Sequence, residues 1–360
     1  MASALHLGRQ VLRVPDLRPA FANWEQGVSP HHGKLIPVVN AQLEKFCSDK
    51  KAVDKGKAIG FALLASSLYP KAAYPVVETM ALYAIWNFFW DDEVDRALDP
   101  DAPDDIAADV AAADMYRAQS IAYIRHQLGL GDAAETSEPV PPTLMCSSFV
   151  TVAPSITRHC NGRQAERLCA SLELFVAATG WEQEARLSGR MPTEEEYWQW
   201  RIGTTSVDAM LDLADIMNGV VLPSQVLESH QVGVMRMEII KNTVYVNDLF
   251  SLRKEMASTQ DDTLMNLVPI TMQQQSLDLN SAAQQIVSKL YESIETFDCA
   301  AEALRKSTAQ HFGAEAVAEL GCLIEAYQTI ATGVFSWTLQ SSRYGVAECK
   351  KEHGRYDITL

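Results

Sequence analysis

Three polar residues in the stretch VNDLFSLRKE have types and a spacing that could do chemistry. Asn247, Ser251 and Glu255 are four positions apart, so they would lie along one face of a helix. An amide, a hydroxyl and a carboxylate make no ladder of ion pairs, but their oxygens suit a hard cation such as Mg²⁺. Lys254, beside Glu255, could act as a point charge on an anion bound to that metal. Taken alone, the row favours a solvated polar face.

A second cluster of oxygen ligands occurs in the stretch FFWDDEVD, at the end of a strongly apolar segment. Asp91 and Asp95 are one helical turn apart, and Asp92 lies beside them. Like charges at this spacing destabilise a bare helix, so a solvated acidic helix end is one interpretation. The preceding turn is aromatic on almost every side, which would place the carboxylates at the mouth of an apolar region. Two such clusters in one helical chain favour metal binding over two solvated surfaces.

The elements that must position these residues are predicted to be helices, because apolar residues recur at three- and four-residue steps. Alternating β-branched runs with Asn-Gly or Asp-Gly turns are missing, so strands are not expected. We predict one all-α domain over 21–345, with an N-terminal tail at 1–20 and a C-terminal tail at 346–360. The predicted helical ranges are 42–68, 75–95, 105–129, 163–187, 194–219, 225–256, 279–306 and 313–343.

The composition narrows the possible partners and location of the protein. The formal net charge of −16 argues against a nucleic-acid partner and disfavours an anionic membrane surface. The seven cysteines form no Cys-x-x-Cys pair, which predicts buried reduced thiols. The start has no apolar signal-peptide core, and the apolar stretch at 80–90 is too short to span a bilayer. We therefore expect a soluble cytoplasmic protein without a transmembrane segment, either a monomer or a homodimer.

Four features together resemble those of class I terpene synthases. The stretch DDEVD resembles the aspartate-rich motif of that family, and NDLFSLRKE resembles its second metal motif of Asn, Ser and Glu with a preceding Lys. The family carries a diphosphate-sensing Arg 46 positions before the Asn, where this chain has Arg201. It also carries an Arg-Tyr pair near the end of its last helix, matched here by Arg343 and Tyr344. The chain resembles most the single-domain fungal and bacterial enzymes.

The resemblance implies a helical bundle around a central apolar cavity that binds an isoprenoid diphosphate through three Mg²⁺ ions. Carried over by position, the metal ligands would be Asp91, Asp92, Asp95, Asn247, Ser251 and Glu255. The donors to the diphosphate would be Arg201, Lys254, Arg343 and Tyr344. Phe88, three positions before Asp91, and Trp337, six before Arg343, match positions that line the cavity in relatives. Further cavity candidates are Phe61 and Phe89, together with Thr204 and Thr205 at the positions that follow the sensing Arg.

The resemblance also implies a reaction, in which the diphosphate ionises and the remaining allylic cation cyclises in a closed, dry cavity. We expect a sesquiterpene synthase acting on farnesyl diphosphate, and geranylgeranyl diphosphate is the alternative because the motifs do not fix the cavity volume. A chain-elongating prenyltransferase shares the chemistry but needs two aspartate-rich motifs. A non-catalytic isoprenoid-binding helical protein is the alternative from another class, and the intact metal residues argue against it.

Overall fold

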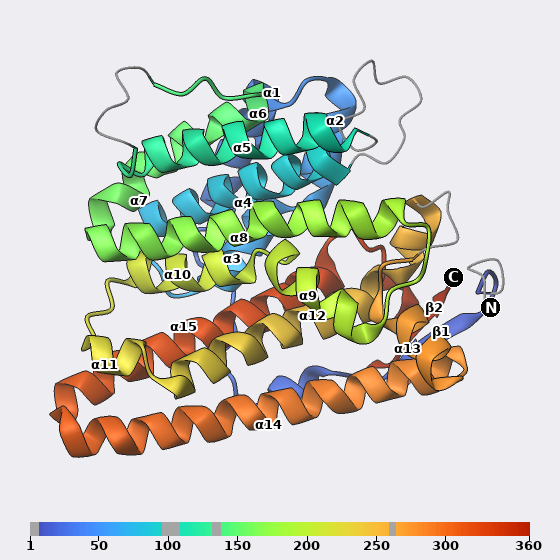
Figure 1. Ribbon diagram of the computed structural model, residues 1–360. Helices are drawn as coiled ribbons and strands as arrows, with labels where there is room; N and C mark the ends of the chain where they lie inside the picture. The colour runs from blue at the N-terminus through green and yellow to red at the C-terminus, as the bar shows by residue number, and fades with distance from the viewer. Residues whose placement is uncertain (1–6, 96–108, 132–137, 259–263) are drawn as a thin grey trace. The chain divides into compact units, whose positions relative to one another are not determined.

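The computed structural model describes residues 7–95, 109–131, 138–258 and 264–360, and every structural statement below concerns these residues (Figure 1). The prediction of an all-α fold is confirmed. The strands are β1 (Val11–Val14) and β2 (Tyr356–Thr359), and the 3-10 helices are η2 (Arg18–Phe21), η3 (Ser148–Thr151), η4 (Ala347–Cys349) and η5 (Glu352–Gly354). The α-helices are α1 (His32–Phe46), α2 (Lys50–Ile59), α3 (Phe61–Leu68), α4 (Tyr74–Asp95), α5 (Val110–Gln127), α6 (Leu144–Ser147), α7 (Ala153–His159), α8 (Gly162–Leu187), α9 (Glu194–Thr204), α10 (Val207–Asn218), α11 (Ser224–Leu227), α12 (His230–Ser258), α13 (Leu267–Gln275), α14 (Leu279–His311) and α15 (Gly313–Gln340).

The chain divides into two compact units, which are described separately. Unit 1 comprises Met1–Gln26, Ser188–Ile202 and Val220–Leu360. Unit 2 comprises Gly27–Leu187 and Gly203–Gly219. The division therefore cuts the predicted helical range 194–219 inside α9, so Arg201 belongs to unit 1 and Thr204 to unit 2.

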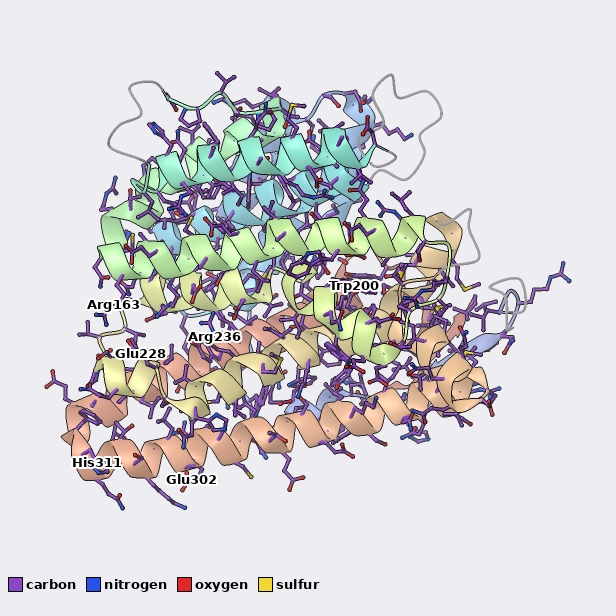
Figure 2. All side chains as sticks on the ribbon, viewed as in Figure 1. Arg163, Trp200, Glu228, Arg236, Glu302 and His311 are labelled. Carbon is purple, nitrogen blue, oxygen red and sulfur yellow. The ribbon has the colours of Figure 1, made fainter. Side chains whose placement is uncertain are left out.

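Unit 1 is built on the three long helices α12, α14 and α15, which pack along one another (Figure 1). Helix α14 is amphipathic, because Ile286, Leu290 and Phe297 are buried while Glu302 and His311 are exposed on its outer face (Figure 2). Helix α9 begins with a capping box formed by Thr193 and Glu196. The Thr193 hydroxyl accepts from the Glu196 backbone N–H at 3.1 Å, and the Glu196 carboxylate accepts from the Thr193 N–H at 2.8 Å.

The two ends of the chain meet in a small antiparallel sheet in unit 1, although the sequence predicts no strands. Strands β1 and β2 pair with Val11 opposite Thr359 and Val14 opposite Tyr356, and β1 packs against α14. Both lie in the segments expected to be tails. Each strand has only four residues, so its alternation of buried and exposed positions is too short to be recognised in the sequence.

Unit 2 packs α4 against α1, α3 and α8, and α8 also contacts α5 and α10. Helix α4 is buried on nearly every side. The rings of Trp86 and Phe149 lie 4.9 Å apart between centroids, and those of Trp90 and Phe175 lie 5.2 Å apart. This aromatic core explains why the segment that ends in DDEVD is apolar all round rather than on one face.

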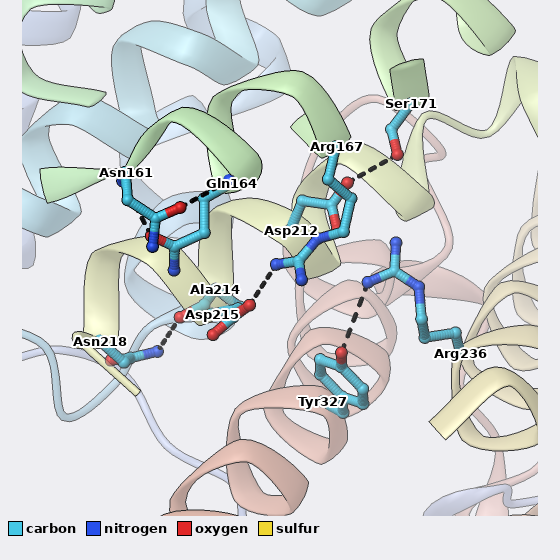
Figure 3. A network of polar contacts seen from close by, with 10 residues as sticks. All are labelled: Asn161, Gln164, Arg167, Ser171, Asp212, Ala214, Asp215, Asn218, Arg236 and Tyr327. Carbon is cyan, nitrogen blue, oxygen red and sulfur yellow. Dashed lines mark hydrogen bonds and ion pairs between the residues drawn. The ribbon is translucent and has the colours of Figure 1, made fainter. Parts of the chain in front are cut away.

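Buried charges join α8 to α10 in unit 2 (Figure 3). Arg167 on α8 donates to Asp212 at 2.8 Å and also to Asp215, both of which are fully buried on α10. The Ser171 hydroxyl donates to the second oxygen of Asp212 at 2.6 Å. Because a buried carboxylate is costly unless it is paired, this network fixes α10 against α8. In unit 1, Arg236 on α12 contacts the Tyr327 hydroxyl on α15 at 3.4 Å (Figure 3).

Several local predictions need correction. The predicted helix at 42–68 is three helices, because the chain turns after Phe46 and because Gly60 adopts a left-handed conformation with φ of 76°. The short helices at 144–159 and α13 were not predicted. All seven cysteines are free, but the prediction of buried thiols holds only for Cys146, Cys169 and Cys349. Cys47 and Cys160 are partly exposed, and Cys299 and Cys322 are exposed. Among the residues described, no helix is long and apolar enough to cross a membrane.

Candidate active site

The Asn/Ser/Glu row lies on α12 in unit 1, as its spacing predicts. Asn247 and Glu255 are partly exposed, whereas Ser251 is fully buried. The Ser251 hydroxyl finds no hydrogen-bond partner among the described residues, which is costly for a buried polar group. A hydroxyl in this state, on the same helix face as an amide oxygen and a carboxylate, has the donor set that a hard cation takes. These residues therefore suit a metal.

Unit 1 brings two of the predicted diphosphate donors to Asn247. Arg201, 46 residues earlier on α9, donates from its Nη2 to the Asn247 amide oxygen at 2.8 Å. The Asn247 amide nitrogen donates to the Tyr344 hydroxyl at 3.0 Å. One amide thus holds a cation on its oxygen and a phenol on its nitrogen. Arg201, Asn247 and Tyr344 form a single polar group at one end of unit 1.

The Arg343-Tyr344 pair is held after the end of α15 by α12. Arg253 on α12 donates to the Tyr344 carbonyl at 3.1 Å, which fixes the backbone of the pair. The Arg343 guanidinium carbon lies 6.0 Å from the centre of the Tyr344 ring. Trp337 packs edge-on against the same ring, with centroids 5.4 Å apart, and burial raises the pKa of Tyr344. Lys254 is partly exposed on α12.

Asp248 is a buried residue of this candidate site that the sequence analysis missed. Its carboxylate is almost completely buried and accepts from the Tyr197 hydroxyl at 2.7 Å and from the Leu267 N–H at 2.8 Å. Arg201 Nη2 lies 3.3 Å from its other oxygen. Burial raises the pKa of Asp248 to about 6, against the opposing effect of Arg201. Asp248 therefore anchors the guanidinium that Asn247 also contacts, and only its position beside Asn247 in the motif could have suggested this.

Asn266 is a second residue that the sequence did not single out. Its side-chain oxygen caps α13 by accepting from the Val268 N–H at 2.9 Å. Its amide nitrogen donates both to the Asp248 carbonyl at 3.0 Å and to the Glu255 carboxylate at 2.9 Å. The start of α13 thereby orients the last member of the metal row. An Asn before an apolar run is a helix-cap signal, but nothing in the sequence connects this cap to Glu255.

The aspartate-rich motif lies at the end of α4 in unit 2. Asp91 and Asp92 are partly exposed, and Lys55 on α2 pairs with the Asp92 carboxylate at 2.7 Å. Asp95 is the last residue of α4, and its side chain lies outside the described part of the chain. Glu93 has a structural role instead, because it accepts from the Tyr116 hydroxyl at 2.6 Å and from the Thr143 hydroxyl at 2.8 Å.

The aromatic candidates of unit 2 pack against one another, and two of them, Phe88 and Phe89, come just before this motif in the sequence. The Phe61 ring on α3 packs edge-on against Phe88, with centroids 5.4 Å apart, and lies 6.1 Å from Phe89. Phe61 and Phe89 are buried, and Phe88 is partly exposed. Phe88 is therefore the member of the three that is open to a neighbouring molecule.

The predicted helical range 194–219 is broken into two helices, α9 and α10. Gly203 lies inside α9, and the interruption comes at Thr205 and Ser206, before α10 begins. Gly203 is needed for packing rather than for a turn, because a Cβ there would lie 2.4 Å from the Ala178 Cβ on α8. Thr204 is buried, and its hydroxyl has no hydrogen-bond partner among the described residues.

The metal candidates depend on amide and hydroxyl oxygens as much as on acids. Within residues 7–95, 109–131, 138–258 and 264–360, no group of three or more His, Cys, Asp and Glu side chains is arranged to hold a metal. The row on α12 supplies only one carboxylate. A cation there would leave coordination positions for the oxygens of a bound anion.

Known proteins resemble this chain over most of its length. It is 26% identical to sesquiterpene cyclase hepA of Aspergillus oryzae over 359 residues, which cover 98% of this chain and 95% of that one. It is 23% identical to the (+)-T-muurolol synthase ((2E,6E)-farnesyl diphosphate cyclizing) of Roseiflexus castenholzii, covering 83% of this chain and 84% of the relative.

Solved structures share the fold, and a family model covers both motif regions. The crystal structure of an α-eudesmol synthase superposes with a TM-score of 0.75 at 16% identity, over 89% of this chain and 98% of that one. Residues 83–296, more than half of the chain, match the model described as terpene synthase family 2, C-terminal metal binding. That range contains Asp91, Arg201 and the whole row from Asn247 to Glu255. The chain therefore belongs to terpene synthase family 2 and is a class I terpene synthase.

Proposed function

We propose that this terpene synthase converts farnesyl diphosphate to a cyclic sesquiterpene in a Mg²⁺-dependent reaction that releases diphosphate. The observation that carries the proposal is the polar group on unit 1. There, Arg201 and Tyr344 contact Asn247, and Ser251 on the same helix has a buried hydroxyl without a protein partner. A buried hydroxyl that serves only the fold would be hydrogen-bonded within the protein. A site for a metal-bound polyanion, in contrast, needs side-chain oxygens for the metal and cationic side chains for the anion.

In this proposal, one set of residues holds the metal and another donates hydrogen bonds to the diphosphate during ionisation. Asn247, Ser251 and Glu255 would be metal ligands in unit 1, and Asp91, Asp92 and Asp95 would be metal ligands in unit 2. When bound, Mg²⁺ neutralises the charge that develops on the departing diphosphate. Arg201, Lys254 and Arg343 would donate to diphosphate oxygens, and Tyr344 would add a hydroxyl donor. Charged donors placed before the reaction stabilise the leaving group at no reorganisation cost.

Apolar and aromatic side chains would protect the cation. We propose that Phe88 and Trp337 face the isoprenoid chain, with Phe61 and Phe89 behind, because aromatic faces attract a cation and exclude water. Thr204 and Thr205 belong to this proposal because α9 ends there and the chain breaks before α10 begins. The three Phe side chains carry no hydroxyl, thiol or amine that would trap the cation.

The names of two relatives support the substrate that we propose. One relative is named a sesquiterpene cyclase, and the name of another specifies (2E,6E)-farnesyl diphosphate. Both match this chain over more than four fifths of its length, so a C15 substrate is the one that we propose.

The test is to incubate the purified chain and Mg²⁺ separately with C10, C15 and C20 isoprenoid diphosphates. Diphosphate release and the hydrocarbon extract are then measured. We expect release and cyclic C15 hydrocarbons from farnesyl diphosphate, and loss of both when EDTA is present. Preferred turnover of the C20 substrate would transfer the proposal to a diterpene synthase. A longer prenyl diphosphate formed with isopentenyl diphosphate would indicate chain elongation, and absence of diphosphate release from every substrate would refute the enzyme assignment.

A further inference from the structure

The break before α10 contains a residue in an unusual conformation. Ser206 has φ of 54° and ψ of 13°, which is the left-handed region that residues other than glycine rarely adopt. It is also buried, with 2% of its surface exposed. Such a conformation persists only where the surroundings hold it, so the contacts of Ser206 indicate what the break is built to do.

Two buried side chains of α4 hold the Ser206 hydroxyl. Asn87 donates to it from Nδ2 at 2.9 Å, and the Tyr83 hydroxyl lies 3.1 Å from it. Asn87 is 5% exposed and Tyr83 is 1% exposed, so all three polar groups meet away from water. Burial raises the pKa of Tyr83, which keeps its hydroxyl protonated and able to donate. All three residues belong to unit 2.

The backbone N–H and the backbone carbonyl of Ser206 are both hydrogen-bonded. Its N–H donates to the Gly203 carbonyl at 2.9 Å, and its carbonyl accepts from the Met210 N–H at 3.3 Å in the first turn of α10. Gly203 in turn packs against α8 at close approach. The Ser206 side chain, which α4 holds, therefore positions both Gly203 near the end of α9 and the first turn of α10.

The holding residues share a helix face with the aspartate-rich motif. Tyr83, Asn87 and Asp91 are four positions apart along α4, so they stack on one face. Asn87 is a polar residue in a segment that is otherwise aromatic and aliphatic, and its amide is used on Ser206. The row thus sets the position of the break relative to the first motif aspartate.

We infer that Tyr83, Asn87 and Ser206 are positioning residues that fix the helix break against α4 and thereby determine which cyclisation product forms. The inference rests on the proposed function for its chemical consequence. In the proposed function the break at Thr204 and Thr205 borders the bound cation, so a displacement of the break would change which cation conformer is stabilised. Tyr83, Asn87 and Ser206 are not among the proposed metal ligands or diphosphate donors, so the product ratio, and not a loss of diphosphate release, is the readout of the clamp.

The first measurement tests the clamp without requiring activity. Hydrogen exchange is followed over residues 203–212 in the wild type, in Tyr83→Phe, in Ser206→Gly and in the double variant. Glycine keeps the left-handed conformation without steric cost, so Ser206→Gly removes only the hydroxyl. We expect the Ser206-to-Met210 region to exchange about fivefold faster in Tyr83→Phe, the effect of one lost buried hydrogen bond, and faster still in Ser206→Gly, which loses the contacts with both Asn87 and Tyr83. The double variant should exchange no faster than Ser206→Gly, because both changes remove the same contact.

The second measurement compares the products. With farnesyl diphosphate, each single variant should shift the ratio of the main product to the other hydrocarbons by about fivefold. The matched control is Tyr123→Phe, which removes another buried hydroxyl of unit 2, one that donates to the Ser147 carbonyl at 3.2 Å. It should leave both the exchange of residues 203–212 and the product ratio at wild-type values.

The outcomes separate the clamp from the proposed function. Unchanged exchange in Tyr83→Phe, or exchange in the double variant that is the product of the two single effects, would overturn the clamp. Faster exchange with an unchanged product ratio would overturn its role in product choice. Failure of the wild type to release diphosphate from any substrate would overturn the proposed function and with it the role in product choice, while the exchange data would still decide whether Tyr83 and Asn87 hold the break.

Discussion

At the scale of single residues, Asn247 is both a proposed metal ligand and the contact of Arg201 in the candidate site of unit 1. Its amide oxygen accepts from Arg201 and its amide nitrogen donates to Tyr344. A bound metal would need that same oxygen, so Asn247 couples metal binding to the position of the guanidinium. An alanine at this position removes both functions without disturbing the buried face of α12.

We expect Asn247→Ala, and separately Asp91→Ala, to lower turnover of farnesyl diphosphate by about 100-fold or more, because each removes a charge-stabilising group that acts in the transition state. Circular dichroism should show unchanged helix content, since both side chains are partly exposed at helix faces. The measurement is the initial rate of diphosphate release at saturating Mg²⁺. Full activity in either variant would show that the corresponding metal site is misplaced.

Asp248 leads to a separate prediction about the anchoring of Arg201. Asp248→Asn keeps a side-chain oxygen for the Tyr197 hydroxyl and the Leu267 N–H but removes the charge that faces Arg201. We expect kcat/KM to fall by about tenfold, the effect of one charge-assisted hydrogen bond. The control is Asp114→Asn, which removes a carboxylate paired with Arg117 but 66% exposed, and should leave kcat/KM unchanged. Equal kcat/KM in Asp248→Asn and the wild type would exclude an anchoring role.

Prediction from the sequence worked at this scale where a residue acts through its spacing along a helix. The row Asn247, Ser251 and Glu255 was predicted from its four-residue period, and the resemblance placed Arg201 and Tyr344 with it. Asp248 was not predicted, because its role comes from burial and from Tyr197 and α13, which only the folded chain brings to it.

At the scale of elements, helices with long apolar periodicity were predictable and the breaks between them were not. Helix α4 begins and ends within a residue of its predicted range. The break at Ser206 gave no such signal, because serine is not a left-handed residue by preference and is held there by Asn87 and Tyr83 from another helix. Gly203, in the same stretch, does not mark a turn, because its role is to leave space for α8.

Gly203 therefore gives a prediction for packing at the break. We expect Gly203→Ala to lower the free energy of unfolding by ~1–3 kcal/mol, because its Cβ would overlap the Ala178 Cβ and the Leu174 carbonyl on α8. The matched control is Gly233→Ala in α12, where nothing lies within 4 Å of the new Cβ. That change should raise stability by up to ~1 kcal/mol, the difference in helix propensity between the two residues. Denaturant unfolding of both variants measures the difference, and a stabilised Gly203→Ala variant would refute the packing argument.

At the scale of the whole molecule, the net charge of −16 opposes binding of a polyanion such as diphosphate. The extent of the functional domain, 21–345, stays a prediction. Both strands, which pair near the two chain ends, lie outside these limits. Family membership resolves the charge conflict in principle, because a family described as metal binding carries its own counter-charge. Arg201, Lys254 and Arg343 alone are too few to offset the acidic surface.

The charge balance predicts that diphosphate binding requires metal. In thermal unfolding we expect inorganic diphosphate alone to leave Tm unchanged, and Mg²⁺ with diphosphate to raise it, because a ligand at a hundredfold excess over its Kd stabilises the native state by ~2.7 kcal/mol. EDTA should reverse the shift. Asn247→Ala should reduce it, since that variant lacks one metal ligand and the partner of Arg201. Sodium sulfate at equal ionic strength controls for general salt effects. A full Tm shift with diphosphate in EDTA would mean that the cationic side chains bind the anion unaided, and the metal-binding role of the row on α12 would then have to be abandoned.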